Sequence, residues 1–394
     1  MAEVSEFLTK YEIPLPVLSD AEYALWAYIV QLPGDSGLSA IISNLVQTFP
    51  TLYAARNDRG VMCLDLATPV YSLAIKSMRL WFGRYHIDDT PEHQSATCFV
   101  YKALDAQAND SVVALKLMRY RSHFLKELKT RKCVLDSGMV VAIINSFPTS
   151  DQNVGLNEDC FASQDEAVQS LTHLTKGQAE KMFCMVMPWA ERNMFVSLKQ
   201  DGYTGGRNLS EVRYIFNKLL LCVEHLHDKF VLHADLKPLN IVRQGGSWKL
   251  IDMDANCTLM EEYVGSKSST AYVPPEALFV CPEQDIVCTR SHANLSKLGL
   301  AFDLLVADPS YDVWALGCIL YQMCSVDGRP LFQGGRDDNL TDDQKDYDNN
   351  LWTLATWSDE VKSHKLSFIH DDIAKNLISL MLHVDPSRRP TIPR

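Results

Sequence analysis

The feature that most constrains this chain is the stretch of residues 231–254, which places acidic and amide side chains around a hairpin signal. Residues 241–243 and 248–251 are short runs typical of strands, and the Gln-Gly-Gly-Ser sequence between them is typical of a turn. Such a hairpin would return Asp252 to the side of Asn240. Carboxylate and amide oxygens suit Mg²⁺, a hard cation, so Asn240 and Asp252 are predicted as its ligands.

Asp235 lies five residues before Asn240, on a stretch that Pro238 stiffens, so its carboxylate is placed to orient a hydroxyl. The block at 233–240, His-Ala-Asp-Leu-Lys-Pro-Leu-Asn, resembles the catalytic loop of protein kinases. The Asp-Met-Asp at 252–254 stands where that family has Asp-Phe-Gly. The whole block followed by a strand-ending aspartate is far more specific than a lone His-x-Asp.

The resemblance implies a set of catalytic residues. Asp235 would accept the proton of a substrate hydroxyl, and Lys237 would steady the γ-phosphate of ATP. Ser269 stands where the family has a threonine that contacts both the catalytic aspartate and the lysine. Asn240 and Asp252 would hold Mg²⁺, which neutralises charge on the transferring group. ATP and Mg²⁺ are therefore the cofactors implied, and Lys237 matches the serine/threonine pattern rather than the tyrosine pattern.

A second group of motifs precedes this stretch and predicts a strand-rich lobe. Two runs have strand character, residues 97–103 and 111–118. The second includes Val-Ala-Leu-Lys, which resembles the third-strand motif of protein kinases. Lys116 would then meet the α- and β-phosphates. The helix predicted around 124–128 resembles the family's αC segment, and its Glu127 is expected to pair with Lys116.

The two lobes are expected to join near residues 183–190, which resemble the family's last small-lobe strand and hinge. Met187 would occupy the gatekeeper position, and the adenine would bind backbone groups near Trp189 and Ala190. Residues 140–147 are predicted as another apolar strand.

The phosphate-binding loop departs from the family pattern. Its three glycines would fall at His93, Ser95 and Cys98, and none of these residues is glycine. Glycine lets backbone amides approach phosphate closely. Ser95, Ala96 and Thr97 would still offer N–H groups, but less freely, so nucleotide binding is predicted to be weakened.

The C-terminal half predicts a helical lobe. Ser210 is predicted as the N-cap of a helix whose apolar stripe faces the core: Val212, Phe216, Leu219, Val223 and Leu226. Asp312, at the start of a helix that is apolar nearly all round, is expected to accept hydrogen bonds from the catalytic-loop backbone. Glu276 of a Pro-Pro-Glu motif is expected to pair with Arg389. Residues 333–350 are acidic and predicted as a solvated loop.

Ala234 carries a prediction about regulation. Kinases switched by activation-loop phosphorylation usually have arginine there, which binds the added phosphate. Without that guanidinium, activity is expected not to depend on loop phosphorylation, and a phosphate on Ser269 is expected to inhibit.

Residues 1–83 read as helical, with apolar helix patterns at 22–30 and 38–49. Residues 54–67 resemble the turn and first helix of an ankyrin repeat, although a single copy is also compatible with a plain helical extension. Either structure could bind a protein partner.

Composition limits the kinds of partner and cellular compartment expected for this protein. The net charge of −12 and the lack of a basic stripe disfavour a nucleic-acid partner. Eleven scattered cysteines favour reduced thiols, and neither a secretory signal nor a membrane-length apolar run is apparent, so a cytoplasmic protein with no membrane partner is expected.

The sequence therefore predicts an α+β, two-lobed, protein-kinase-like fold over residues 84–394, with the small lobe at about 84–188 and the large lobe at about 189–394, preceded by a helical module at 1–83. The expected function is ATP-dependent phosphorylation of serine/threonine hydroxyls on protein substrates. Three alternatives stay open: a weakly active pseudokinase scaffold, a small-molecule phosphotransferase, and an ankyrin-type binding module confined to the N-terminus.

Overall fold

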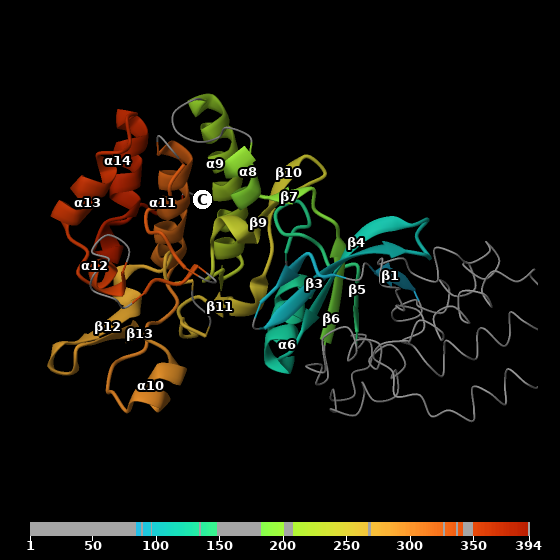
Figure 1. Cartoon of the computed structure of the whole chain (residues 1–394), viewed down its shortest axis with the longest axis horizontal. Helices are drawn as coiled ribbons and strands as arrows, with labels where there is room; N and C mark the ends of the chain where they lie inside the picture. The colour runs from blue at the N-terminus through green and yellow to red at the C-terminus, as the bar shows by residue number, and fades with distance from the viewer. Residues whose placement is uncertain are drawn as a thin grey trace, which may run out of the picture. The chain divides into compact units, whose positions relative to one another are not determined.

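The computed structural model describes most of the chain from residue 84 onward (Figure 1): residues 84–87, 90–95, 97–133, 135–147, 183–200, 208–266, 269–325, 328–335, 338–341 and 350–392. The helices predicted within 1–83, including the ankyrin-like segment, lie outside the described residues.

The chain divides into two compact units, and only a small part of the first is described. In that part, strand β1 (Tyr85–Ile87) pairs antiparallel with the end of β3 (Cys98–Asp105). Arg84 donates two hydrogen bonds of 2.7 Å to the carboxylate of Asp105, which holds the pKa of that carboxyl below its usual range.

The second unit begins with an antiparallel sheet. Its strands follow the order β3, β4 (Ser111–Met118), β6 (Phe183–Pro188) and β5 (Asn145–Phe147), with β2 (His93–Gln94) pairing with β3. The strands predicted around 97–103 and 111–118 are confirmed. The strand predicted over 140–147 is shorter than expected: β5 covers only its last three residues, while Val140 forms a single bridge to Leu250 of the other lobe.

Helix α6 (Arg121–Cys133) packs on this sheet (Figure 1). Phe124 and Leu128, one helical turn apart, are buried in a cluster with Cys98, Met118 and Met185. The ring of Phe124 stacks on Phe183 with 5.2 Å between centroids. This apolar contact fixes the face of α6 and turns the residue before Leu128 toward the sheet's lysine.

The rest of the second unit is mainly helical. Helices α9 (Leu209–Asp228), α11 (Pro309–Cys324) and α14 (Asp372–Met381) lie side by side, with α11 in the middle (Figure 1). The remaining elements are shorter: β7 (Arg192–Asn193), α8 (Met194–Gln200), β8 (Val231–Leu232), β11 (Cys257–Thr258), β12 (Leu278–Cys281), β13 (Ile286–Thr289), α10 (His292–Leu298), α12 (Leu351–Ala355) and α13 (Asp359–Leu366).

Helix α9 confirms the predicted stripe and corrects its cap. All five stripe residues are buried in the large core. The N-cap is Asn208 rather than Ser210: the Asn208 side chain accepts a hydrogen bond of 3.2 Å from the N–H of Glu211. Both residue types suit the position, but Asn208 reaches the third helical N–H, so the helix begins before Ser210.

The predicted hairpin is confirmed. Strands β9 (Ile241–Gln244) and β10 (Ser247–Leu250) pair antiparallel, and β7 pairs with the other side of β9. Gly245 and Gly246 both have positive φ, 60° and 78°, which is the backbone that a tight hairpin turn requires and glycine adopts readily.

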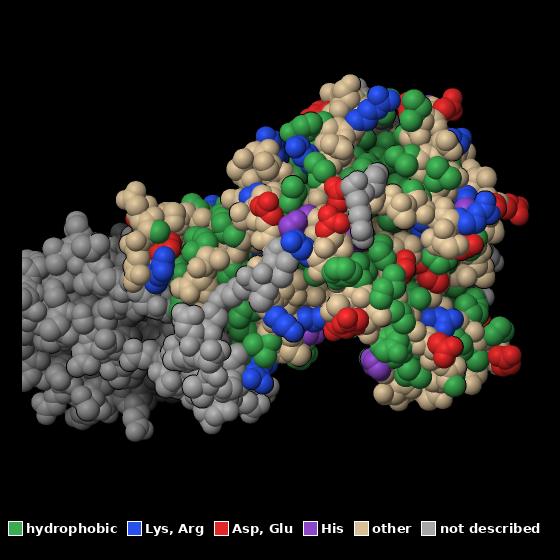
Figure 2. Space-filling view, turned by 180° about the vertical axis from the view of Figure 1, so that it is seen from behind, with side chains coloured by type: hydrophobic (Ala, Val, Ile, Leu, Met, Phe, Trp, Pro, Cys, Tyr) green, Lys and Arg blue, Asp and Glu red, His purple; other side chains and the backbone are tan. Residues whose placement is uncertain are grey.

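On the face shown in Figure 2, Lys and Arg side chains are interspersed with Asp and Glu rather than gathered in a stripe. Among the described residues, no helix has the length and apolar character needed to cross a membrane.

Candidate active site

The catalytic-loop backbone is held by the buried carboxylate of Asp312, as predicted. It accepts hydrogen bonds from the N–H groups of His233 (2.9 Å) and Ala234 (3.1 Å), and the ring of His227 lies 3.0 Å away. Ala234 has φ 63°, a left-handed backbone that is strained by roughly 1 kcal/mol for a residue other than glycine. The Asp312 contacts offset this strain and fix the direction in which Asp235 leaves the loop.

The ring of His233 connects this loop to the next one. Its Nε2 lies 3.1 Å from the carbonyl oxygen of Ile251, and its Nδ1 accepts from the N–H of Asp235. Because a carbonyl can only accept, Nε2 is the donor in this pair, and Nδ1 is the acceptor. His233 therefore positions Asp235 on one side and the residue before Asp252 on the other.

The structure brings the three predicted catalytic residues together. The hydroxyl of Ser269 donates to Asp235 Oδ1 at 2.8 Å and accepts from Lys237 Nζ at 2.6 Å. Lys237 Nζ also lies 3.7 Å from Asp235 Oδ2. All three residues are buried. This arrangement joins the end of the activation segment to the catalytic loop without phosphorylation.

The two predicted metal ligands have donor groups that suit Mg²⁺. Asn240 uses its amide N–H₂ to donate to the backbone oxygen (2.8 Å) and to Oδ2 (3.2 Å) of Asp235, so its own oxygen is the atom left for a cation. Asp252, with φ 64°, is the N-cap residue of the 3-10 helix η5 (Met253–Ala255). Two such ligands are enough for a magnesium ion that also binds phosphate and water.

A buried charge network joins the sheet to α6 and to Asp252. Lys116 Nζ donates to Glu127 Oε2 at 2.7 Å, as predicted, and also pairs with Asp252 Oδ1. Burial lowers the pKa of the Lys116 ammonium, but the negative charges of Asp252, Glu127 and Asp254 outweigh it, so the pKa lies above its ordinary value. Lys116 is therefore charged at neutral pH and can meet a phosphate.

Arg131 is a site residue that the sequence reasoning missed. Its guanidinium lies 2.8 Å from Glu127 Oε1, one helical turn away, and donates to the carbonyl oxygen of Val141 (2.9 Å) and to the Met187 sulfur (3.0 Å). Arg131 thus ties the lysine–glutamate pair to the predicted gatekeeper. The Glu-x-x-x-Arg spacing on one helix was the available signal.

The predicted hinge residues lie around one small apolar cluster. Met187 is buried with Val141 and Val242, and Ala190 packs against them. Trp189 lies between Met187 and Ala190 in the chain, just after β6, and is partly exposed. These residues form a small apolar surface beside the end of β6.

Two further contacts hold α6 against the start of the activation segment. Asp254, which replaces the family's glycine, is buried and lies 3.6 Å from Nδ1 of His123. Thr130 donates to the side-chain oxygen of Asn256 at 3.1 Å. Because both contacts join α6 to η5 or its flank, they favour the position of the helix in which Glu127 reaches Lys116.

The phosphate loop is a tight turn closed by its own serine. The N–H of Ser95 donates to the carbonyl oxygen of Cys98 at 2.9 Å. The Ser95 hydroxyl oxygen lies 3.2 Å from the N–H groups of Thr97 and of Cys98 and accepts from both. The expectation that Ser95 and Thr97 offer their amides to a phosphate is therefore wrong for the structure as it stands, and Ala96 lies outside the described residues.

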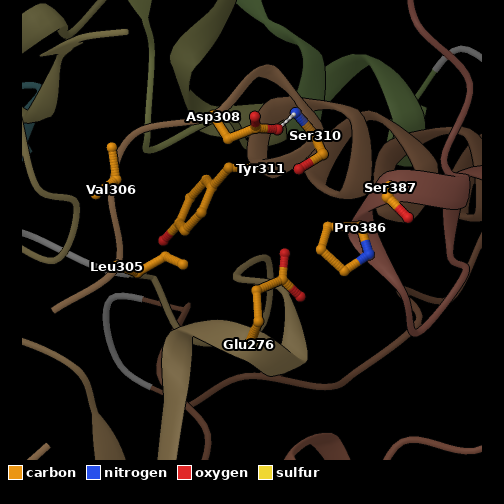
Figure 3. A pocket seen from close by; sticks show the side chains of 8 residues that line it. All are labelled: Glu276, Leu305, Val306, Asp308, Ser310, Tyr311, Pro386 and Ser387. Atoms are coloured by element: carbon orange, nitrogen blue, oxygen red, sulfur yellow. Dashed lines mark hydrogen bonds between the residues drawn. The ribbon is translucent and has the colours of Figure 1, made fainter. Parts of the chain in front are cut away.

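The other predicted large-lobe contact is also present. Arg389 donates two hydrogen bonds to the Glu276 carboxylate, at 2.6 and 2.7 Å. Glu276 also borders a pocket with residues from the segment 305–311 and with Pro386 and Ser387 (Figure 3). Beside it, Asp308 caps α11 by accepting from the N–H of Ser310. None of the predicted site residues lines this pocket.

The prediction of a solvated loop at 333–350 holds only in part for residues 338–341: Asn339 and Thr341 are exposed, whereas their neighbours contact the rest of the lobe. Leu340 is buried, and its N–H donates to the Thr270 hydroxyl at 2.7 Å. The carbonyl oxygen of Asp338 accepts from the N–H of Ala271 at 3.0 Å. Acidic composition indicated solvent, but backbone groups here pair with the end of the activation segment.

The fold has a strand-rich lobe and a helical lobe. A lysine, aspartates and an asparagine lie together where the two lobes meet, and this combination is typical of a phosphotransferase. The chain belongs to the protein kinase family, because the family model described as Protein kinase domain matches residues 94–394.

Individual relatives agree with this membership. The chain is similar to the probable serine/threonine-protein kinase mps1 of Dictyostelium discoideum, with 27% identity over 226 residues, which covers 55% of this chain and 20% of that protein. It is also similar to the serine/threonine-protein kinase MPS1 of Saccharomyces cerevisiae, 28% over 194 residues (46% and 22%), and to mph1 of Schizosaccharomyces pombe, 36% over 133 residues (32% and 17%). The chain thus spans about a fifth of the length of these relatives.

Proposed function

We propose that this protein is a serine/threonine kinase that transfers the γ-phosphate of ATP to hydroxyl groups of protein substrates. The observation that carries the proposal is the contact of Ser269 with both Asp235 and Lys237, at 2.8 and 2.6 Å. It supports the proposal because a carboxylate and a cation lie together at the end of the segment that receives the substrate in this family. The relatives' names support the serine/threonine class.

The proposed roles follow from the chemistry of each group. Asp235 orients the substrate hydroxyl and takes its proton as the oxygen attacks phosphorus. Lys237 and Lys116 place positive charge beside the phosphates, where negative charge is held in the transition state. Glu127 keeps Lys116 in position. Met187, Trp189 and Ala190 border the place proposed for the adenine.

Asn240 and Asp252 are proposed to hold Mg²⁺, which would neutralise charge on the phosphates when bound. The Asp235 contacts orient the Asn240 amide so that its oxygen is the remaining ligand atom. Among the described residues, no cluster of three or more His, Cys, Asp or Glu side chains offers a metal site made by protein alone. The proposal therefore depends on phosphate and water to complete the coordination.

A pseudokinase scaffold is the second candidate, and one observation favours it. The Ser95 hydroxyl already accepts from two N–H groups of the phosphate loop, so nucleotide must compete with it. The intact Lys116 and Asp252 contacts favour the active kinase instead. The proposal also includes a division of the chain into 1–83 and 84–394, with an ankyrin-like segment in the first part that binds a protein partner. It further includes a cytoplasmic location and the lack of phosphorylation control through Ala234.

The test combines binding with transfer. Purified protein is titrated with ATP in the presence and absence of Mg²⁺ while its melting temperature is followed, and transfer of labelled γ-phosphate to a generic basic protein is measured. Magnesium-dependent stabilisation with transfer to serine or threonine supports the kinase. Stabilisation without transfer supports the scaffold, and transfer only to a small molecule supports a different phosphotransferase.

A further inference from the structure

The guanidinium of Arg131 is a buried cation that joins three parts of the small lobe. Only 2% of its side chain is exposed. Its Nη1 donates to the carbonyl oxygen of Val141 at 2.9 Å and to the sulfur of Met187 at 3.0 Å. Its Nη2 lies 2.8 Å from Glu127 Oε1. One side chain therefore connects α6 with the backbone at residue 141 and with β6.

The two carboxylate oxygens of Glu127 contact different cations. Oε2 accepts from Lys116 Nζ at 2.7 Å, and Oε1 lies against the Arg131 guanidinium. The Glu127 side chain is fully buried, and a buried carboxylate depends on the cations that pair with it. Because the carboxylate is planar, the contact that fixes Oε1 also fixes the direction in which Oε2 faces Lys116.

The shape of arginine matters for this arrangement. A guanidinium holds its donors in a rigid fork, whereas a lysine ammonium is a point charge on a flexible stem. A lysine at position 131 could neutralise Glu127, but it would not hold Val141 and Met187 in the same fixed geometry. Those two contacts anchor the guanidinium, so the carboxylate of Glu127 is paired with a cation that is itself held in place.

We infer that Arg131 is a positioning residue for the phosphates of the nucleotide, because it acts through Glu127 to hold Lys116 where a phosphate meets it. This inference deepens the proposed function and rests on the ATP binding within it. Without the guanidinium, Oε1 loses its cation in a buried place, which favours a rotated carboxylate. Lys116 keeps its contact with Asp252, so the loss is one of placement rather than of charge.

The first test compares ATP with adenosine, which has the base and the ribose but no phosphate, by calorimetric titration in the presence of Mg²⁺. Arg131→Met removes the cation and keeps a long unbranched side chain. ATP affinity should fall by about fivefold or more, while adenosine affinity should change by less than about twofold. Arg131→Lys should give a smaller loss that is again confined to ATP. Equal losses for the two ligands would mean that Arg131 only supports the fold, and would overturn the inference.

The second test is a double-mutant cycle with Glu127→Gln, measured on kcat. In the wild-type background, Arg131→Met should lower kcat by about tenfold. In the Glu127→Gln background the same substitution should lower it by less than about twofold, because the group through which Arg131 acts is already altered. The same loss in both backgrounds would show that Arg131 does not act through Glu127.

Arg84→Lys is the matched control, because Arg84 also makes a fork contact, with two hydrogen bonds of 2.7 Å to Asp105, which is not a site residue. It should change neither affinity. Denaturation curves check that each variant is folded at the assay temperature, and Arg131→Lys carries both tests if Arg131→Met does not fold. Wild-type protein that binds ATP without transferring phosphate would overturn the proposed function, while the comparison of ATP with adenosine would still decide this inference. A wild type that does not bind ATP would overturn both.

Discussion

The catalytic loop and the phosphate loop of this kinase-family chain treat their polar groups in opposite ways. Around Asp235, each contact arranges a chemical group toward a common point: Asp312 holds the backbone, Asn240 and Ser269 hold the carboxylate. In the phosphate loop, the Ser95 hydroxyl accepts from the amides that would face a phosphate. The contacts of the catalytic loop orient the Asp235 carboxylate, whereas those of the phosphate loop join its own side-chain and backbone groups to one another.

This difference separates two requirements of phosphoryl transfer. Positioning and charge stabilisation depend on the buried network, which is complete before nucleotide arrives. Under the proposed function, nucleotide affinity depends also on the phosphate loop, where ATP would compete with the Ser95 hydroxyl for backbone N–H groups. The comparison therefore predicts that variants in the network lose stability, catalysis or magnesium-dependent binding, while variants in the phosphate loop change affinity alone.

The largest effect on stability is expected from Glu127→Ala. It removes a carboxylate that pairs with Lys116 and lies 2.8 Å from Arg131, all buried. Removing one member of a buried charge network should lower the free energy of unfolding by about 3 kcal/mol. Chemical denaturation measures the free energy of unfolding, and Glu283→Ala, at an exposed residue, is the control. A change within the error of that control would show that the network does not hold α6.

Asp252→Ala is expected to weaken magnesium-dependent ATP binding by roughly 100-fold or more, because a metal ligand and a partner of Lys116 are lost together. Calorimetric titration with and without Mg²⁺ measures it. Asp285→Ala, at a turn away from the site residues, serves as the matched control. Equal affinity in wild type and Asp252→Ala would remove Asp252 from the metal site.

Ser95→Ala is expected to tighten ATP binding by about fivefold, since it releases two N–H groups and a net gain of one hydrogen bond to phosphate contributes roughly 1 kcal/mol. Ser95→Thr keeps the hydroxyl and is the matched control. The two variants are compared by calorimetry at one magnesium concentration. Weaker binding in Ser95→Ala would mean that the hydroxyl itself contacts the nucleotide.

The smallest effect is expected from phosphatase treatment. Ser269 and Thr270 are buried and already hydrogen-bonded, and Ala234 offers no charge to a phosphate. Transfer rates before and after treatment should agree within about twofold. A fall of tenfold or more, about 1.4 kcal/mol in the barrier, would contradict this, provided mass spectrometry finds the lost phosphate between residues 252 and 276.

Local patterns predicted the parts of the fold that depend on near neighbours. The Gly245-Gly246 turn, the α9 stripe and the contact of Glu127 with Lys116 all follow from periodicity or motif spacing. The N-cap was misplaced by two residues because Asn208 and Ser210 are both good caps, and only the geometry of the first turn distinguishes them.

Two site features could not be read from the chain alone. Ser95 is chemically able either to face a phosphate or to cap its own turn, and the choice depends on the closed geometry of the turn. Asp338 lies about a hundred residues after Asp235, in a stretch whose acidic composition suggests solvent. Its place beside Lys237 depends on long-range backbone pairing with Ala271.

The most direct test of the central claim compares wild type with Asp235→Asn across a range of ATP concentrations. This substitution removes the proton acceptor while keeping the shape of the side chain. The account predicts saturable transfer by wild type, an ATP affinity in Asp235→Asn within about twofold of wild type, and a kcat lower by roughly 10²–10⁴-fold. Equal kcat values in the two proteins, or a loss of ATP binding that accounts for the whole loss of rate, would contradict it.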